Sequence, residues 1–256
     1  MMRTVVCQSF CATGVPPWIE RCLASVRDWS ALRAFDYRFV DDALLGLVPD
    51  WYREKADGVL PIVTDLARLR LIQALLAGGY ERAIWLDADV LIFDPNDFEI
   101  GVTAQYAFGR EIWVQSAGGN RLRTYRNVHN ALTVFVAGND FLDFYAHACE
   151  AIVGRHRSGG MAPQIVGTKL LTALHNLIGF ALVDDVAMFS PLVVRDVTAG
   201  GGAALERLCE ETPGRIRAAN LCASLVGRTV DGVAVAADLL DQSCDRLLER
   251  GLYACG

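Results

Sequence analysis

The chain has 256 residues, 53% hydrophobic and 21% charged, a composition that suits one compact α/β domain with a sizeable core. Its formal net charge of −6 argues against general nucleic-acid binding. No stretch approaches the roughly 18 uninterrupted apolar residues of a membrane span.

The first residues predict a strand over 4–10, without the long apolar region and small-residue cleavage site of a signal peptide. We therefore expect a cytoplasmic location. The eight cysteines are scattered and form no C-x-x-C pair, so we expect them to be reduced core residues.

Two further elements are indicated before residue 41. Apolar residues at helical spacing predict a helix over 18–26. Residues 35–40 alternate apolar and polar side chains and run into Asp41 and Asp42, which predicts a strand with an acidic end.

A helix is predicted over residues 66–77. Thr64 is expected to cap its first turn, and Asp65 favours the positive end of its dipole. Gly78 and Gly79 are expected to end it.

Residues 83–93 form an apolar run that is interrupted by Asp87 and Asp89. The run contains no Gly or Pro and predicts a buried strand, in which residues i and i+2 lie on the same face. Two neighbouring carboxylates in an apolar setting are costly to bury unless a cation or hydrogen-bond donors compensate. A hard divalent cation, which often shares its oxygen ligands with phosphates, is the simplest partner. The alternative is a strand that ends at Leu86, with both carboxylates in a solvated turn.

Alternating strands and helices with short connections predict a mostly parallel sheet flanked by helices. Ligands of such sheets bind outside the carboxyl ends of the strands. Three groups of residues are expected at such carboxyl ends: Gln8, Ser9 and Phe10, then Asp41 and Asp42, then Asp87 and Asp89.

The alternation of predicted strands and helices is less regular beyond residue 100. The sequence predicts a strand over 131–137, a helix over 140–153, a basic loop over 154–160, a helix over 165–178 and a strand over 180–183.

The remaining segments carry weaker signals. A glycine-rich loop is predicted over 199–202, and an amphipathic helix over 236–253 is expected to pack on its own domain, with no support for peripheral membrane contact. Four arginines that cluster in sequence are interpreted as a solvated surface loop in preference to an anion or acceptor contact: Arg110, Arg121, Arg123 and Arg126.

Asp65 and Arg68 share a helix face, and a solvent-exposed ion pair is the simplest interpretation of them alone. Together with the strand that follows, however, residues 64–71 (TDLARLRL) and 80–91 (YERAIWLDADVL) resemble GT-A glycosyltransferases that carry a D-x-D motif. The spacing is closest to the retaining family of glycogenin and the bacterial lipopolysaccharide galactosyl- and glucosyltransferases. Features are also shared with the capsular and Golgi α-hexosyltransferases.

The resemblance is strong over residues 62–94, moderate over 4–10 and 129–145, and weak after about 165. It implies one GT-A (Rossmann-like) domain over residues 1–256. The nucleotide-binding half would span about 1–100, and the acceptor-binding half about 101–256.

The same resemblance implies the roles of individual residues. Asp87 and Asp89 would bind Mn²⁺ or Mg²⁺. Asp65, Arg68 and Gln164 would be the catalytic residues, although Pro163 replaces the acidic residue expected before Gln164. The implied donor-binding residues are Gln8, Ser9, Phe10, Asp65, Arg68, Asp87, Ala88 and Asn130.

The family usually supplies a third metal ligand, a histidine near the C-terminus. No histidine follows His175 in this chain. Asn220 and Ser224 are the nearest candidates for that position, although simple burial of either side chain is the more ordinary interpretation.

The resemblance implies a metal-dependent glycosyltransferase that moves a hexose, with retention, from a nucleotide-sugar to an acceptor hydroxyl. A UDP-sugar is expected in preference to a GDP-sugar. The expected acceptor is a glycan, a lipid-linked molecule or a small molecule. The expected biological role is bacterial surface-glycan synthesis. One alternative is a non-catalytic nucleotide- or glycan-binding protein of the same fold. Another is a different metal enzyme, such as a phosphotransferase.

Overall fold

The computed structural model describes residues 2–119, 121–157 and 160–252. Within them, three of the five pairings of a six-stranded sheet are parallel, and β6 runs antiparallel to both of its neighbours. This confirms the predicted α/β class, with a mostly parallel sheet flanked by helices. Across the sheet the strands are β2 (Asp36–Val40), β1 (Thr4–Ser9), β3 (Arg82–Leu86), β6 (Leu122–Val136), β5 (Tyr106–Ser116) and β7 (Ala181–Val183).

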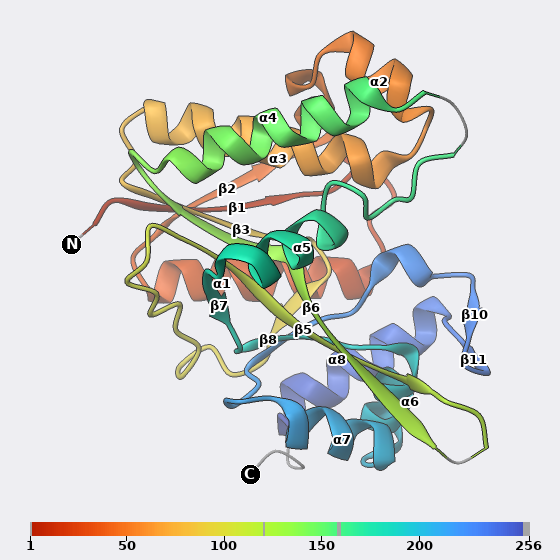
Figure 1. Ribbon diagram of the computed structural model, residues 1–256. Helices are drawn as coiled ribbons and strands as arrows, with labels where there is room; N and C mark the ends of the chain where they lie inside the picture. Colours follow the sequence, from red (N-terminus) through yellow and green to blue (C-terminus); the bar gives the residue numbers. More distant parts are fainter. Residues whose placement is uncertain (1, 120, 158–159, 253–256) are drawn as a thin grey trace.

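Helices cover both faces of this sheet. α3 (Leu60–Ala77) and α4 (Asp140–Arg155) lie on one face, and α1 (Pro17–Leu32) lies on the other (Figure 1). In β1, Val5 and Cys7 belong to the core beneath α3, and Val6 belongs to the core beneath α1. The middle residues of β1 and β3 are apolar because both faces of these strands are covered.

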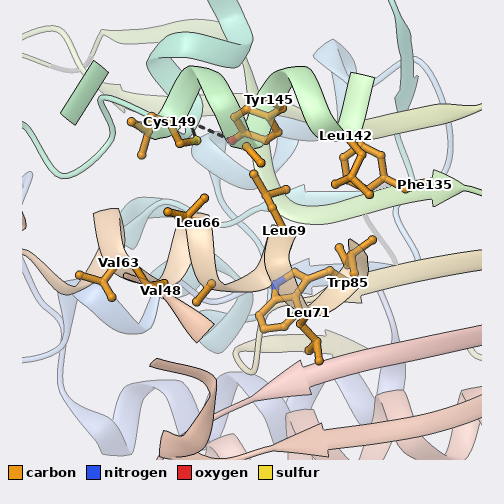
Figure 2. Packing of buried hydrophobic residues seen from close by; sticks show 14 of the residues in the cluster. Val48, Val63, Leu66, Leu69, Leu71, Trp85, Phe135, Leu142, Tyr145 and Cys149 are labelled. Carbon is orange, nitrogen blue, oxygen red and sulfur yellow. Dashed lines mark hydrogen bonds between the residues drawn. The ribbon is translucent and has the colours of Figure 1, made fainter. Parts of the chain in front are cut away.

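The core beneath α3 and α4 is shown in Figure 2, where Leu66 and Leu69 of α3 are drawn with Tyr145 of α4 and Trp85 of β3. Ten of the 18 residues of α3 are buried, so this helix is enclosed on most sides. Asp65 and Arg68 are among the buried ones, and a charged pair held this way occupies a fixed position.

A smaller sheet lies beside the main one, in the order β4 (Val90–Ile92), β9 (Ala218–Asn220) and β8 (Val186–Met188). A second core joins it to α1 and to three later helices, which lie in the lower part of Figure 1. These helices are α6 (Pro191–Ala199), α7 (Ala203–Glu211) and α8 (Ala237–Arg250). The other described elements are η1 (Asp42–Leu47), α2 (Asp50–Ala56), α5 (Thr168–Ile178), η2 (Ala223–Leu225), β10 (Thr229–Val230) and β11 (Val233–Ala234).

The predicted cap of α3 is wrong. The helix begins at Leu60, with a proline in its first turn, so Thr64 lies inside it. The Thr64 hydroxyl donates to the carbonyls of Leu60 and Pro61. The predicted end is correct, because α3 stops at Ala77 immediately before Gly78.

The largest error concerns β5 and the first half of β6, of which only the segment after residue 130 is predicted. Arg110 lies in β5 and pairs with Asp184, and Arg126 lies in β6 and pairs with Glu211. The predicted surface loop is therefore a β-hairpin. Its polar residues alternate with apolar ones because only one face of this ribbon is buried.

Several later predictions hold in part. Residues 200–202 connect α6 to α7 as a loop, but those two helices and the smaller sheet are not predicted. The last predicted helix is observed as α8, which buries Leu240 and Leu247 and leaves Leu248 exposed. The loop over 154–160 falls partly outside the described residues.

Six described cysteines are free thiols, and five of these are buried. Cys209 is in a disulfide, so the expectation of reduced cysteines is wrong for this residue. None of the described helices is long and apolar enough to cross a membrane.

Candidate functional site

The two carboxylates of the D-x-D segment lie in a turn between the two sheets. β3 ends at Leu86, the Val90 amide donates to the Asp87 carbonyl at 3.0 Å, and β4 then pairs with β9. The predicted continuous strand is therefore wrong. The alternative is correct that the strand ends at Leu86 and that a turn follows, but this turn is not fully solvated, because the Asp87 side chain is only 28% exposed and Asp89 is partly buried.

Arg68 joins the carboxylates of two elements. Its Nη1 lies 3.0 Å from Asp87 Oδ1, and its Nη2 lies 3.1 Å from Asp65 Oδ1. Trp85, two residues before Asp87 in the chain, donates from Nε1 to the same Asp87 oxygen at 2.6 Å. The guanidinium carbon lies 5.1 Å from the centre of the Trp85 ring, so charge pairing and ring contact both fix its position.

Asn130 lies at a β-bulge in the pairing of β5 with β6. The register slips between Phe108 and Gly109, which leaves residues 130–132 out of register with β5. Asn130 donates from Nδ2 to Asp65 Oδ1 at 2.7 Å, and its carbonyl accepts from Arg68 at 2.6 Å. The bulge therefore places one residue against both buried charges.

Glycine is required opposite this bulge. A Cβ atom at Gly109 would lie 1.9 Å from the His129 ring, which is buried against β5. Burial lowers the pKa of His129 to about 4. The ring is therefore neutral at neutral pH, and His129 lines the same cavity as Asp65 and Asp87.

Asp89 is held from the opposite side, by residues more than 130 positions later in the chain. Its Oδ1 accepts from Asn220 Nδ2 at 2.7 Å, and its Oδ2 accepts from the Ala223 amide at 2.7 Å. Burial, with the nearby Asp87 charge, raises the pKa of Asp89 to about 6 despite these bonds. The hydrogen bonds to Asp89 therefore do not fully offset the cost of burying its negative charge. A bound cation would stabilise the charged form further.

The donor set fits a hard divalent cation. A carboxylate offers about four lone-pair positions, so the bonds above leave capacity on both Asp87 and Asp89. No cluster of three His, Cys, Asp or Glu side chains that could hold a metal occurs among the described residues. Asn220 Oδ1 already accepts from the Cys222 amide at 2.9 Å, so Asn220 orients Asp89. Two carboxylates suit an ion that completes its shell with phosphate oxygens and water.

Three cavities adjoin at this site. The central cavity, of about 270 Å³, contains Asp65, Arg68, Asp87, Asp89 and Asn130 in its walls. A second cavity of about 180 Å³ shares Arg68 and both D-x-D carboxylates with it. A third, of about 360 Å³, shares another set of residues with the central cavity: Gln164, Thr168, Met188, Cys222 and Ser224.

Ser9, Phe10 and Ala88 line the second cavity, as expected for residues at the carboxyl ends of β1 and β3. Gln8 is not among the lining residues and is fully buried. Its Nε2 donates to the Asp87 carbonyl at 3.1 Å, and its Oε1 accepts from the Tyr37 hydroxyl at 3.0 Å. The structure therefore places Gln8 behind the site, where it positions Asp87.

Gln164 is exposed and borders both the central and the third cavity. It lies just before α5, whose first residues approach Asp65 closely. A Cβ atom at Gly167 would lie 2.6 Å from Asp65 Oδ2 and 3.0 Å from Asn130 Nδ2. Only glycine allows this approach without displacing one of the two side chains.

The sequence predictions do not include the residues of the β5–β6 hairpin that line the third cavity: Glu111, Trp113, Gln115, Tyr125 and Asn127. One signal for them is present in the sequence. Between residues 111 and 115, Ile112 and Val114 alternate with Glu111, Trp113 and Gln115, which is the period of a strand with one buried face.

No protein-family model and no curated protein matches this chain. Several solved structures are similar to it, among them two glycosyltransferases. One is a glycosyltransferase involved in the glycosylation of the major capsid of PBCV-1, with 10% identity, a TM-score of 0.49, and coverage of 94% of this chain and 98% of that one. The other is the glycosyltransferase GlyE of Streptococcus pneumoniae TIGR4, with 11% identity and a TM-score of 0.41 over 98% of this chain and 64% of that one. This chain thus spans less than two thirds of GlyE, and neither similarity identifies its substrate.

Proposed function

We propose that this chain is a metal-dependent glycosyltransferase that moves a hexose from a nucleotide-sugar to an acceptor hydroxyl. One observation carries the proposal: Asp87 and Asp89 follow a central strand of the sheet and line one cavity with Arg68 and Asp65. Ligands of α/β sheets bind beyond the carboxyl ends of the strands. The resemblance of residues 62–94 to D-x-D glycosyltransferases supports the same activity.

The reaction needs charge stabilisation at the departing diphosphate. A divalent cation, Mn²⁺ or Mg²⁺, would supply Lewis-acid stabilisation there, and Asp87 and Asp89 are the residues proposed to hold it. Arg68 adds a positive charge that is already oriented by its two carboxylate partners. Because the guanidinium is almost fully buried, the charge acts with little screening by water.

The sugar of the donor would lie in the central cavity. Asp65 and Asn130 are joined by a hydrogen bond and would orient its hydroxyl groups. Gln164, at the border of the central and third cavities, would lie near the anomeric carbon. These are the residues that would fix the hexose for attack by the acceptor.

The nucleotide would occupy the second cavity, beside Ser9 and Phe10. A UDP-sugar is expected in preference to a GDP-sugar on the sequence alone. On this proposal, residues 1–100 bind mainly the nucleotide and residues 101–256 mainly the acceptor. Retention, a role in bacterial surface-glycan synthesis and a cytoplasmic location rest on the sequence alone.

A second candidate is a protein that binds a nucleotide or glycan without turnover. It is favoured by the absence, among the described residues, of any group of three His, Cys, Asp or Glu side chains that could hold a metal ion. The presence of Pro163 before Gln164 supports it as well.

Hydrolysis of nucleotide-sugars separates the two functions. We expect release of the nucleoside diphosphate from a UDP-hexose with Mn²⁺, lost on chelation and in Asp89→Asn. Asp28→Asn, which changes an exposed carboxylate of α1, is the matched control and should retain the wild-type rate. If no UDP- or GDP-hexose is turned over while metal-dependent nucleotide binding persists, the binding protein is the better account.

A further inference from the structure

We propose that the third cavity is the acceptor site and that it binds a neutral saccharide whose ring stacks on Trp113 and whose hydroxyls bond to Glu111. The assignment of this saccharide as the acceptor rests on the proposed function. The cavity has a volume of about 360 Å³, which lies in the range of small-molecule binding sites.

The wall of this cavity is one face of the β5–β6 hairpin. Trp113 lies directly opposite Tyr125, and Glu111 lies directly opposite Asn127. All four side chains are partly exposed, whereas Ile112 and Val114 between them are buried in the core. The strand period therefore presents an aromatic pair and a polar pair, side by side, to the cavity.

An aromatic ring beside a carboxylate and amides suits a sugar. One face of a pyranose carries C–H groups and is apolar, so it packs on an aromatic ring, while its hydroxyls need hydrogen-bond partners at the edge. Glu111 Oε1 accepts from Asn127 Nδ2 at 2.6 Å, which orients the carboxylate. Its remaining lone pairs are available to sugar hydroxyls.

The charge of the cavity selects a neutral ligand. None of the described residues that line it is lysine or arginine, and Glu111 is its one carboxylate. Arg123 stacks on Tyr125, with 4.7 Å from the guanidinium carbon to the ring centre, but it is exposed and does not line the cavity. A uronic acid or a sugar phosphate would bring a second negative charge next to Glu111, and none of the described lining residues is a cation that could balance it.

The position of the cavity fits an acceptor. Gln164 and Ser224 border both this cavity and the central one, so a hydroxyl at their boundary lies next to the proposed position of the donor sugar. In the transfer, the acceptor oxygen bonds to the anomeric carbon while the bond from this carbon to the diphosphate oxygen breaks. The hydroxyl proton passes to the departing diphosphate.

Saturation-transfer NMR on the full chain tests this proposal, because it detects weak saccharide binding. The probes are methyl glucoside, methyl galactoside, methyl N-acetylglucosaminide and methyl glucuronide, each with and without UDP and Mn²⁺. We expect transfer to at least one neutral pyranoside, strongest at its C–H face, and binding of the glucuronide at least tenfold weaker. In Glu111→Gln the difference between neutral and acidic sugars should shrink.

Trp113→Ala should reduce the affinity for the neutral pyranoside at least tenfold, and Trp113→Phe should reduce it less, because a ring is retained. Trp51→Ala, which changes an exposed tryptophan of α2, is the matched control and should bind normally. Circular dichroism of each variant establishes that it is folded. Unchanged saccharide binding in folded Trp113→Ala, or a preference for the glucuronide, would overturn the proposal.

Calorimetric titration of the same Trp113 variants with UDP and Mn²⁺ separates this proposal from the proposed function. Normal UDP binding with lost saccharide binding supports both. If the wild-type protein binds UDP but none of the four sugars, the acceptor-site proposal is wrong and the donor site stands. If it binds a neutral sugar through Trp113 but no nucleotide, the saccharide site stands and the transferase function fails.

Discussion

Arg68 Nη1 lies 3.0 Å from Asp87 Oδ1, and this contact joins the buried helix α3 to the turn that follows β3. The other terminal nitrogen of Arg68 contacts Asp65, so one planar guanidinium spans two carboxylates. The arginine thus sets the position of Asp87 in the cavity wall before any ligand binds.

Replacing Arg68 by alanine is expected to destabilise the protein by about 3–5 kcal/mol, because Asp65 is left buried with only an amide partner. Arg68→Lys should cost less stability, but it cannot span both carboxylates. Urea denaturation measures both effects. Arg27→Ala, an exposed residue of α1, is the control. An Arg68→Ala variant with the wild-type urea midpoint would contradict the role assigned to this contact.

The stability of the metal-free protein should depend on Asp65 in a defined pH window. Burial raises the pKa of this carboxyl from 3.8 to about 6, although Arg68 and Asn130 oppose the shift. The folded state therefore holds a proton that the unfolded chain has released. Stability falls as the pH rises from about 4 to 6, by at most about 1.4 kcal/mol per pH unit for one group.

The Asp65→Asn variant isolates this contribution. The free energy of unfolding of the wild type minus that of the variant, measured in urea with a chelator, should fall between pH 4 and 6 and be constant above. Asp28→Asn should show no such trend, because that carboxylate is exposed. A wild-type-minus-Asp65→Asn difference that is constant from pH 4 to 7 would show that Asp65 has an ordinary pKa.

Gly167→Ala should displace Asp65 or Asn130, since the added methyl group would lie 2.6 Å from one and 3.0 Å from the other. We expect a loss of about 1–3 kcal/mol, as for other overpacked sites. Binding of a UDP-hexose should weaken more than binding of UDP, because the displaced groups face the proposed position of the sugar. Gly101→Ala is the control, since its methyl group would meet nothing within 4 Å. Equal melting temperatures and affinities in the two variants would argue against this packing.

Gln8→Leu tests whether Gln8 positions Asp87 or contacts the base. Its removal leaves the partly buried Asp87 carbonyl and Tyr37 hydroxyl without these hydrogen bonds and should cost about 1–3 kcal/mol. Because the side chain does not line the second cavity, the affinities for UDP and GDP should fall by the same factor. A changed preference between the two nucleotides, measured by calorimetry, would mean that Gln8 does contact the base.

Local signals account for the features that could be predicted from the sequence. The apolar runs of β1 and β3 and the glycine after α3 are visible within a few residues. The D-x-D carboxylates, Asp65 and Arg68 could be assigned to one site because they lie within 25 residues of one another. Their grouping around one cavity follows from a single helix and the strand after it.

Long-range pairing accounts for most of the rest. The partners of Asp89, Asn220 and Ala223, are 131 and 134 residues away. The family resemblance indicates Asn220 as a candidate metal ligand, but no local pattern predicts that either residue bonds to Asp89. The half of the β5–β6 hairpin near its tip has one polar face, so charged and polar residues obscure its alternation in the sequence. Gln8 precedes Ser9 at the end of β1, but the alternation of side chains in the strand turns it away from the cavity.

The most direct test of the central claim is calorimetric titration of the protein with UDP, with and without Mn²⁺, in the wild type and in Asp89→Asn. The structure predicts tight binding of UDP to the wild type only when the metal is present, and a loss of that metal dependence in a folded Asp89→Asn variant. The same affinity for UDP with and without Mn²⁺, or unchanged metal-dependent binding in Asp89→Asn, would contradict the assignment of Asp87 and Asp89 as the metal and nucleotide site.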